Sequence, residues 1–301
     1  MSDEGEAAEL IRRADLLGRG VSDTEIRSAR RSGSIVAVRR GCFVDKRRFT
    51  DSAPEARHLL AARAALAAGG PGLTLSHESA ALAWGMSLWQ GPPPLVHLTV
   101  DRPTGGRVDA VRHLHTHPLA DVDVVMRDGA RVTSAARTVA DLACASSFEA
   151  AVCVGDSALA CTPTSIDDIT EAIRGCGRRR GVAGARRAAA FLDGRSESVG
   201  ESRSRVYLDR HGLPAPELQI EIVIDGRTYR PDFLWEDQRV LGEFDGLAKY
   251  TRNGESANAV VIREKLREDA LRAAGWIVVR WTWADLVDGR LAQRIRAALS
   301  A

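Results

Sequence analysis

The chain has 301 residues, of which 45% are hydrophobic, and a formal net charge of +2, values that fit a globular protein of two or three domains. No apolar run reaches the roughly 18 residues that span a bilayer, and the acidic opening MSDEGEAAEL lacks the apolar core of a signal peptide. The five scattered cysteines form no C-x-x-C pair and indicate neither a zinc site nor a disulfide framework, so we expect a cytoplasmic protein with no membrane partner.

Residues 1–52 are predicted to form a small winged helix. Apolar residues at helical spacing, beginning with Leu10 and Ile11, predict a first helix that ends near Gly18. Ser22 and a glutamate three residues later form a capping box, so a second helix begins at Asp23. The β-rich segment IVAVRRGCFVD, interrupted by RRG, predicts a hairpin. Helix, turn, helix and hairpin follow one another as in a winged helix.

This segment is also strongly basic, since residues 12 to 48 hold eleven basic and four acidic side chains. Five arginines fall on the two elements that would touch a duplex, the second helix and the hairpin tip: Arg27, Arg30, Arg31, Arg39 and Arg40. Because neutralisation of phosphates drives such binding, we expect DNA as a partner. The alternative is a solvated basic face on a small helical subdomain.

Residues 53–195 are predicted to form a middle α+β domain with a basic linker helix. A helix begins at Pro54, and further helices are predicted in LSHESAALAWGM, SAARTVADLACAS, SFEAAVCVGDSALAC and SIDDITEAIRGC. VHLTVDRP and RVDAVRHLHTHP alternate like strands. We find no catalytic motif here and expect a structural role or a protein partner, such as a cognate toxin.

Three histidines of the middle segment, His113, His115 and His117, lie two residues apart. On a strand they share one face, as ligands of a metal ion would. Pro118 ends the strand at once and no fourth ligand is evident, which favours an exposed polar strand face instead.

The linker is rich in arginine, and two interpretations of it stay open. It is either a solvated linker and helix or a second surface that contacts phosphates. The arginines concerned are Arg178, Arg179, Arg180, Arg186 and Arg187.

Residues 196–301 predict a core with one mixed sheet. A helix runs from Ser198 to Asp209 or Arg210, and Asp225-Gly226 signals a tight hairpin. A second hairpin joins TYRPDFLW to RVLGEFDG, a long helix follows in ANAVVIREKLREDALRAAG, and WIVVRWTW and ADLVDGRLAQRIRAAL predict a strand and a closing helix. The fold class expected for the whole chain is therefore α/β, or α+β overall.

The registers of the two hairpins follow from their turns. If Asp237-Gln238 is the second turn, Asp232 lies opposite Glu243, and the Asp225-Gly226 turn places Gln219 opposite Asp232. One face of the meander would then be polar, with Gln219, Glu221, Arg230, Asp232, Glu243 and Asp245. The other would be apolar, with Ile220, Ile222, Ile224, Tyr229, Phe233, Trp235, Val240 and Phe244.

The opposed carboxylates of Asp232 and Glu243 predict a metal site. Like charges directly opposite each other destabilise a sheet, and a hard cation such as Mg²⁺ or Mn²⁺ removes the conflict. The alternative is an exposed charge cluster of Arg230, Glu221 and Asp245, which leaves the opposed pair unexplained.

These residues carry a resemblance to known families. The pattern P-D-x(10)-E-x-D, preceded by a helix with a glutamate, resembles the PD-(D/E)XK nuclease superfamily. ES-x-SR, HGLP-x-PELQ, RPDFLW, EFDG and LREDALRAAGW with VVRWTW resemble the very-short-patch-repair-like endonuclease domain of actinobacterial proteins. RGVSDTEIRSARRSGSIVAVRRG is similar to the winged helix of AbiEi-type antitoxins.

The resemblance implies roles for individual residues. Asp232 and Glu243 would bind the metal, Glu201 would add an outer acidic group, and Gln219 would orient water. Glu201 is equally well explained as the capping partner of Ser198. The basic residues Arg263, Lys265 and Arg267 would line the substrate groove, or serve as i,i+4 partners of Glu264 and Glu268.

This sequence departs from the superfamily at one position. The lysine expected two residues after the glutamate is replaced by Asp245, and Lys249 is the nearest candidate to supply its charge. We therefore expect a DNA-binding, Mg²⁺- or Mn²⁺-dependent endonuclease. The alternatives are a non-catalytic antitoxin or transcriptional autoregulator with a nuclease-like scaffold, and a nuclease that acts on RNA.

Overall fold

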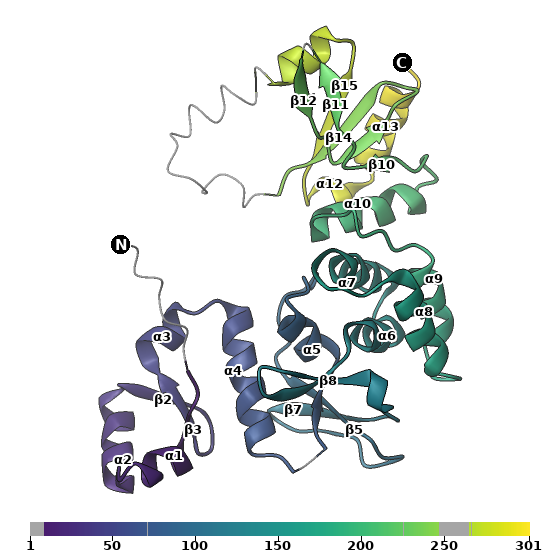
Figure 1. The fold of residues 1–301 in the computed structure, drawn as a ribbon. Coiled ribbons are helices and arrows are strands. Elements are labelled where there is room, and N and C mark those ends of the chain that lie inside the picture. The colour runs from purple at the N-terminus through teal and green to yellow at the C-terminus, as the bar shows by residue number, and fades with distance from the viewer. Residues whose placement is uncertain (1–8, 71, 225, 247–264, 266) are drawn as a thin grey trace.

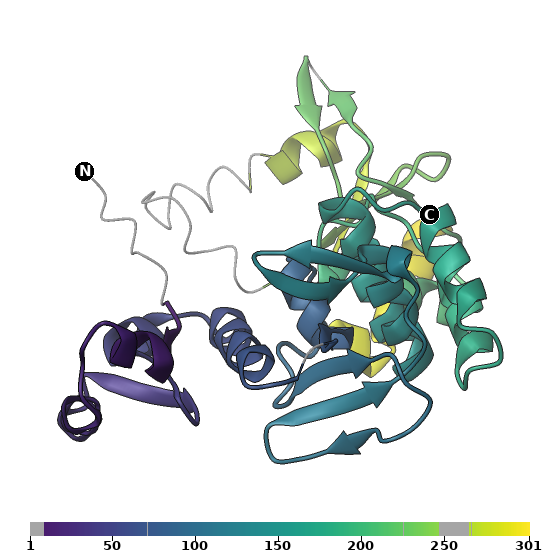
Figure 2. The same ribbon diagram turned by 60° about the horizontal axis from the view of Figure 1, so that its bottom comes forward.

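The computed structural model describes residues 9–70, 72–224, 226–246, 265 and 267–301. It has an α/β fold in which three groups of elements follow one another along the chain (Figure 1). In Figures 1 and 2, helix α4 (Pro54–Ala67) lies between the N-terminal elements and the central sheet. Among the described residues, every helix is too short or too polar to cross a bilayer.

The N-terminal elements confirm the predicted order of helix, helix and hairpin. They are β1 (Ile11–Arg12), α1 (Arg13–Gly18), α2 (Asp23–Ser32), β2 (Ile35–Arg39), β3 (Cys42–Asp45) and α3 (Lys46–Asp51). The capping box of Ser22 and Glu25 is present, and α2 ends at Gly33, whose φ of 75° suits glycine. The first helix begins later than predicted, because Ile11 pairs with Phe43 in a sheet of order β1-β3-β2.

The middle elements surround a six-stranded sheet of order β6-β7-β5-β4-β9-β8. Its strands are β4 (Thr74–Leu75), β5 (Val96–Val100), β6 (Arg107–Val108), β7 (Arg112–Thr116), β8 (Val124–Arg127) and β9 (Ala130–Thr133). The helices are α5 (His77–Trp84), α6 (Ala135–Ala145), α7 (Phe148–Cys161), α8 (Ile166–Gly175) and α9 (Val182–Ala189), with the 3-10 turn Asp121–Asp123. Alanines of α4 and α5 pack on Leu75, Leu98 and Leu114 of the sheet.

Helix α10 (Val199–Arg210) joins the middle elements to the C-terminal ones. Its Val206 belongs to the apolar core that α5 to α9 build. Arg205 Nη1 donates a 2.7 Å hydrogen bond to Oδ2 of the fully buried Asp156 on α7, and Arg203 Nε donates to Glu149 over 2.7 Å. A packed and charged interface, rather than an open linker, therefore lies at the predicted boundary near residue 196.

The C-terminal elements build a four-stranded mixed sheet and a separate ribbon. The sheet has the order β10-β13-β14-β15, and its strands are β10 (Glu217–Leu218), β13 (Phe233–Trp235), β14 (Val240–Phe244) and β15 (Ile277–Trp281). The ribbon consists of β11 (Ile222–Ile224) and β12 (Arg227–Tyr229). Residues 267–273 are helical, and Gly289 divides the closing helix into α12 (Asp285–Asp288) and α13 (Arg290–Leu299).

Both predicted registers are confirmed. Phe233 pairs with Gly242 in one hairpin and Ile222 pairs with Tyr229 in the other. The second turn differs in length, because residues 236–239 form a four-residue loop with a φ of 53° at Arg239. The loop is longer than the expected two-residue turn by one residue at each end, so the pairing of the flanking strands is unchanged. Asp225 lies outside the described residues.

The prediction of a single apolar face on the meander is wrong. Phe233 and Phe244 pack with Trp281 and α13, whereas Ile224 and Tyr229 pack in another cluster with Leu271. The remaining members follow the same division. The chain leaves the strand conformation at residues 219–221 and 230–232, so the alternation of side chains starts afresh. Helices then cover both faces of the four-stranded sheet.

Candidate active site

Three predicted site residues meet where α10, β10 and β13 come together. Glu201 lies in the first turn of α10, Gln219 follows β10, and Asp232 precedes β13. Gln219 Nε2 lies 3.0 Å from Glu201 Oε2 and 3.3 Å from Asp232 Oδ1, and it donates to both. One side-chain amide thus links two carboxylates from distant parts of the sequence.

Local interactions hold Glu201 in place. Its backbone N–H donates to Ser198 Oγ over 3.2 Å, and its carboxylate accepts hydrogen bonds from Ser198 Oγ (2.7 Å) and the Glu197 backbone N–H (2.8 Å). The interpretation of Glu201 as the partner of Ser198 is confirmed, and the same carboxylate also reaches Gln219. Burial raises the pKa of Glu201 above its ordinary value, and the nearby charge of Asp232 raises it further.

Backbone geometry positions Gln219 and Asp232. Gln219 has a φ of 56°, which is uncommon for a residue with a side chain, and its N–H donates to the Asp232 carbonyl over 3.2 Å. Asp232 Oδ2 accepts a 2.8 Å hydrogen bond from the Phe244 N–H. Because Phe233 pairs with Gly242, the same register places Asp232 beside Glu243, as predicted.

Glu243 is buried and lies between two arginines. Its Oε1 is 3.0 Å from Arg267 Nη2 and its Oε2 is 2.9 Å from Arg280 Nη2. Arg267 therefore pairs with a carboxylate of the sheet, a partner that the sequence did not indicate. The sequence prediction missed Arg280, which the parallel pairing of β14 with β15 places directly beside Glu243.

The remaining predicted residues have separate outcomes. Asp245 is partly exposed, with Oδ2 3.9 Å from Arg280 Nη1. Lys249 and Arg263 lie outside the described residues. The alternative cluster of Arg230, Glu221 and Asp245 is wrong, because Arg230 Nη1 pairs with Glu197 over 2.8 Å. That pairing is possible because the strand conformation ends before Arg230.

The oxygen-rich side chains suit a hard divalent cation held by few protein ligands. Among the described acidic groups, no three bring ligand oxygens within 4.8 Å of one another. Mg²⁺ commonly uses one or two carboxylates and takes water or phosphate for the rest, so Asp232 and Glu243 fit this mode. A cation bound at Glu243 would lie close to the positive charges of Arg267 and Arg280.

The N-terminal arginines form a second candidate site. Arg27 and Arg30 of α2 and Arg40 of the hairpin tip line a concave surface that encloses a pocket of about 850 Å³. Arg12 and Arg13 also line it, but these two are paired with Asp15 and Asp23. Two further predicted residues lie away from this surface, exposed Arg31 and half-buried Arg39.

The arginine-rich linker is partly packed against the middle elements. Arg179 Nη1 donates a 2.5 Å hydrogen bond to the buried Asp141, and the Arg187 guanidinium stacks 4.8 Å from the centre of the Phe148 ring. Arg179 is therefore not a solvated linker residue, because its guanidinium is paired with a buried carboxylate, whereas Arg187 is exposed and both interpretations stay open for it.

Comparison with known proteins adds a limited amount. No family model matches the chain. Two uncharacterized proteins of Mycobacterium tuberculosis, MT2308 of strain CDC 1551 and Rv2248 of strain H37Rv, are each 36% identical over 138 residues, 45% of this chain and 48% of the relative. The chain thus spans about half the length of these curated relatives. The crystal structure of the RV2827C protein from the same species is similar with a TM-score of 0.41 and 16% identity, over 73% of this chain and 84% of that one.

Proposed function

We propose that this protein binds DNA through its N-terminal elements and hydrolyses phosphodiester bonds at the cluster of Glu201, Gln219, Asp232 and Glu243, using Mg²⁺ or Mn²⁺. The observation that carries the proposal is the Gln219 side chain, which bridges the carboxylates of Glu201 and Asp232 beside Glu243. Acidic groups gathered this closely are costly unless a cation or a proton offsets them, and Arg267 and Arg280 contribute such cations at Glu243.

Each group in the cluster has a defined task in this proposal. Asp232 and Glu243 hold the cation, which would polarise the scissile phosphate and lower the pKa of an attacking water. Glu201 acts through Gln219 to hold the Asp232 carboxylate in one orientation. Asp245 accepts the proton of the water, because its partly exposed carboxylate lies at the end of β14. The resemblance to PD-(D/E)XK nucleases makes Lys249 the other candidate for a side chain near the attacking water.

The N-terminal surface supports DNA as the substrate. Arg27, Arg30 and Arg40 bring three guanidinium groups to one concave surface, and such groups neutralise phosphates on binding. This surface and the resemblance of the segment to AbiEi-type winged helices support delivery of DNA by the N-terminal elements.

A cleavage assay with matched asparagine variants tests the proposal. The protein, Asp232→Asn and Asp237→Asn are incubated with plasmid and labelled duplex DNA, with Mg²⁺, Mn²⁺ or EDTA. Asp237 is exposed in the loop between β13 and β14, so its replacement controls for the loss of one charge. Cleavage should need the cation, disappear in Asp232→Asn and persist in Asp237→Asn. Cleavage that survives in Asp232→Asn would contradict the proposal.

A second candidate is a non-catalytic DNA-binding regulator, such as an antitoxin that represses its own operon. The pairing of Glu243 with Arg267 and Arg280 favours it, because these arginines compensate the carboxylate without a metal. Metal-independent binding of a specific DNA sequence, with no cleavage under any condition above, would support this candidate.

A further inference from the structure

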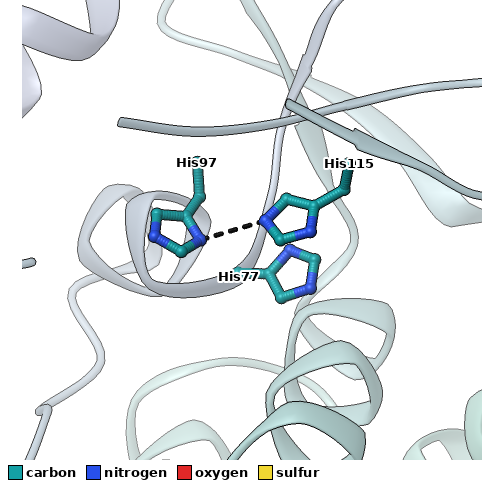
Figure 3. A group of neighbouring side chains, drawn as sticks. All are labelled: His77, His97 and His115. Carbon is teal, nitrogen blue, oxygen red and sulfur yellow. Dashed lines mark hydrogen bonds between the residues drawn. The ribbon is translucent and has the colours of Figure 1, made fainter. Parts of the chain in front are cut away.

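Three histidines from separate elements converge in the middle region, away from the acidic cluster. His77 begins α5, His97 lies on β5 and His115 lies on β7. Figure 3 shows the three imidazole rings gathered together, with a hydrogen bond between His97 and His115, and one nitrogen from each ring lies within 4.8 Å of the other two. The rings of His77 and His115 are stacked with their centres 3.8 Å apart.

The expectation of an exposed polar strand face at His113, His115 and His117 is therefore wrong. All three are half-buried, and the ring of His113 stacks on that of His115 at 3.8 Å. Parallel pairing of β5 with β7 brings His97 next to them. The histidines that lie close enough to share a metal ion are His115 of β7, His97 of β5 and His77 of α5. They come from separate parts of the sequence.

The contacts of His97 Nδ1 cannot all be satisfied by one proton. This nitrogen lies 3.1 Å from His115 Nε2 and 3.2 Å from Glu78 Oε2. The Oε2 atom is buried and accepts no hydrogen bond from a described group. A proton on Nδ1 can serve only one neighbour well, and a lone pair there can accept from only one of them. A cation bound by Nδ1 and His115 Nε2 would remove this competition.

Burial of the three imidazoles favours their uncharged form. It lowers the pKa of His97 to about 4 and that of His115 to about 2, and it lowers the pKa of His77 well below its ordinary value. Burial also raises the pKa of Glu78. An uncharged imidazole offers a nitrogen lone pair, as metal coordination requires.

We propose that His77, His97 and His115 form a binding site for a divalent transition-metal ion, with Zn²⁺ as the best match. Zn²⁺ accepts imidazole nitrogen and carboxylate oxygen in tetrahedral geometry. Nitrogens about 2.0–2.1 Å from a tetrahedral Zn²⁺ are roughly 3.3 Å apart, close to the 3.1 Å between His97 Nδ1 and His115 Nε2.

Binding requires the His77 ring to turn out of its stack on His115 and to exchange one contact. Its two nitrogens now lie 3.0 Å from Ser76 Oγ and 3.3 Å from Arg179 Nη2, so the metal replaces one of these contacts. The charge of Arg179 is offset by the buried Asp141. The φ of 50° at His77, uncommon for a residue with a side chain, aims its ring at the strands. The metal would tie α5 to β5 and β7.

Titration of the metal-free full-length protein tests the site. Zn²⁺ is added in competition with a coloured chelator, and Co²⁺ is used separately because tetrahedral Co²⁺ absorbs strongly in the visible range. The wild type should bind one Zn²⁺ per chain, show the Co²⁺ absorption and unfold at higher temperature with Zn²⁺. His97→Gln and His115→Gln should each weaken binding by more than about tenfold.

The control is His211→Gln, since His211 lies on the C-terminal side of α10 and contacts Tyr207 instead. It should bind Zn²⁺ like the wild type. Unchanged binding in folded His97→Gln, or no binding by the wild type, would overturn the proposal. X-ray absorption of the Zn²⁺-loaded wild type needs no variant. It should show three imidazole nitrogens at about 2.0–2.1 Å, and a shell of oxygen alone would also overturn the proposal.

Discussion

Arg280 on β15 lies beside Glu243 on β14, with its Nη2 2.9 Å from the Oε2 of the buried carboxylate. The parallel register of the two strands creates this contact. The guanidinium of Arg280, like that of Arg267, therefore places a positive charge of the protein itself against Glu243. The strength of this pair therefore governs whether Glu243 is available to a metal ion.

Replacement of Arg280 by glutamine should lower the free energy of unfolding by about 1–3 kcal/mol, because the buried carboxylate loses a charged hydrogen-bonding partner. Added Mn²⁺ should recover part of this loss if Glu243 is a metal ligand. Urea unfolding with and without Mn²⁺ measures both effects. Arg290→Gln is the control, since Arg290 pairs with Asp288 while 80% exposed, and it should change the free energy by less than about 0.5 kcal/mol. An equal loss of unfolding free energy in Arg280→Gln and Arg290→Gln would show that the contact between Arg280 and Glu243 contributes no more than an exposed ion pair.

The raised pKa of Glu201 should appear as a pH-dependent stability. The folded state holds this proton to higher pH than the unfolded state, so the contribution of Glu201 to stability falls as pH rises from its ordinary pKa through the raised one. Glu201→Gln removes this term. Urea unfolding at intervals from acidic to neutral pH should therefore show the wild type losing stability relative to Glu201→Gln as pH rises.

Glu25→Gln is the matched control with the opposite sign. Hydrogen bonds from Ser22 lower the pKa of Glu25, so its contribution is present above the ordinary pKa and lost as pH falls. Relative to Glu25→Gln, the wild type should gain stability as pH rises. The same slope for both residues would show that the pKa of Glu201 is not raised.

The concave basic surface should give DNA binding that depends strongly on salt. Arg27→Ala and Arg40→Ala should each weaken binding to a similar extent for all sequences and reduce the slope of log K against log salt by about 1. Fluorescence anisotropy with labelled duplexes at several NaCl concentrations measures this slope. Arg174→Ala, which removes an exposed arginine of α8, is the control. A slope that falls equally in the control would place the phosphate contacts elsewhere.

Gly200 in α10 permits the close approach of Phe244 on β14. A Cβ at Gly200 would lie 2.0 Å from Phe244 Cε1, so Gly200→Ala should destabilise the protein by about 1–3 kcal/mol. Gly184 in α9 has open space around it, and Gly184→Ala should stabilise by about 0.5–1 kcal/mol because alanine favours a helix. Urea unfolding of the two variants gives the comparison. Stabilisation by Gly200→Ala would show that this contact is loose.

Short-range patterns predicted most of the helices and part of the acidic cluster, but not the hairpin of β8 and β9. The capping box at Ser22 defines α2, and the hairpin registers place Gln219 next to Asp232 and Asp232 next to Glu243, as expected. These features depend on residues a few positions apart. The break in the meander at Gln219, where φ is 56°, was not predicted, because no local residue pattern signals it.

The sequence by itself determined most of the helices, the hairpin registers of the C-terminal segment and the residues that could serve as acids, bases and ligands. Only the tertiary structure decided which of them meet. Arg280 reaches Glu243 through a parallel strand pair, and His77 and His97 reach His115 from another helix and strand. The physical reason is that parallel pairing and helix packing join segments whose separation in sequence leaves no local pattern.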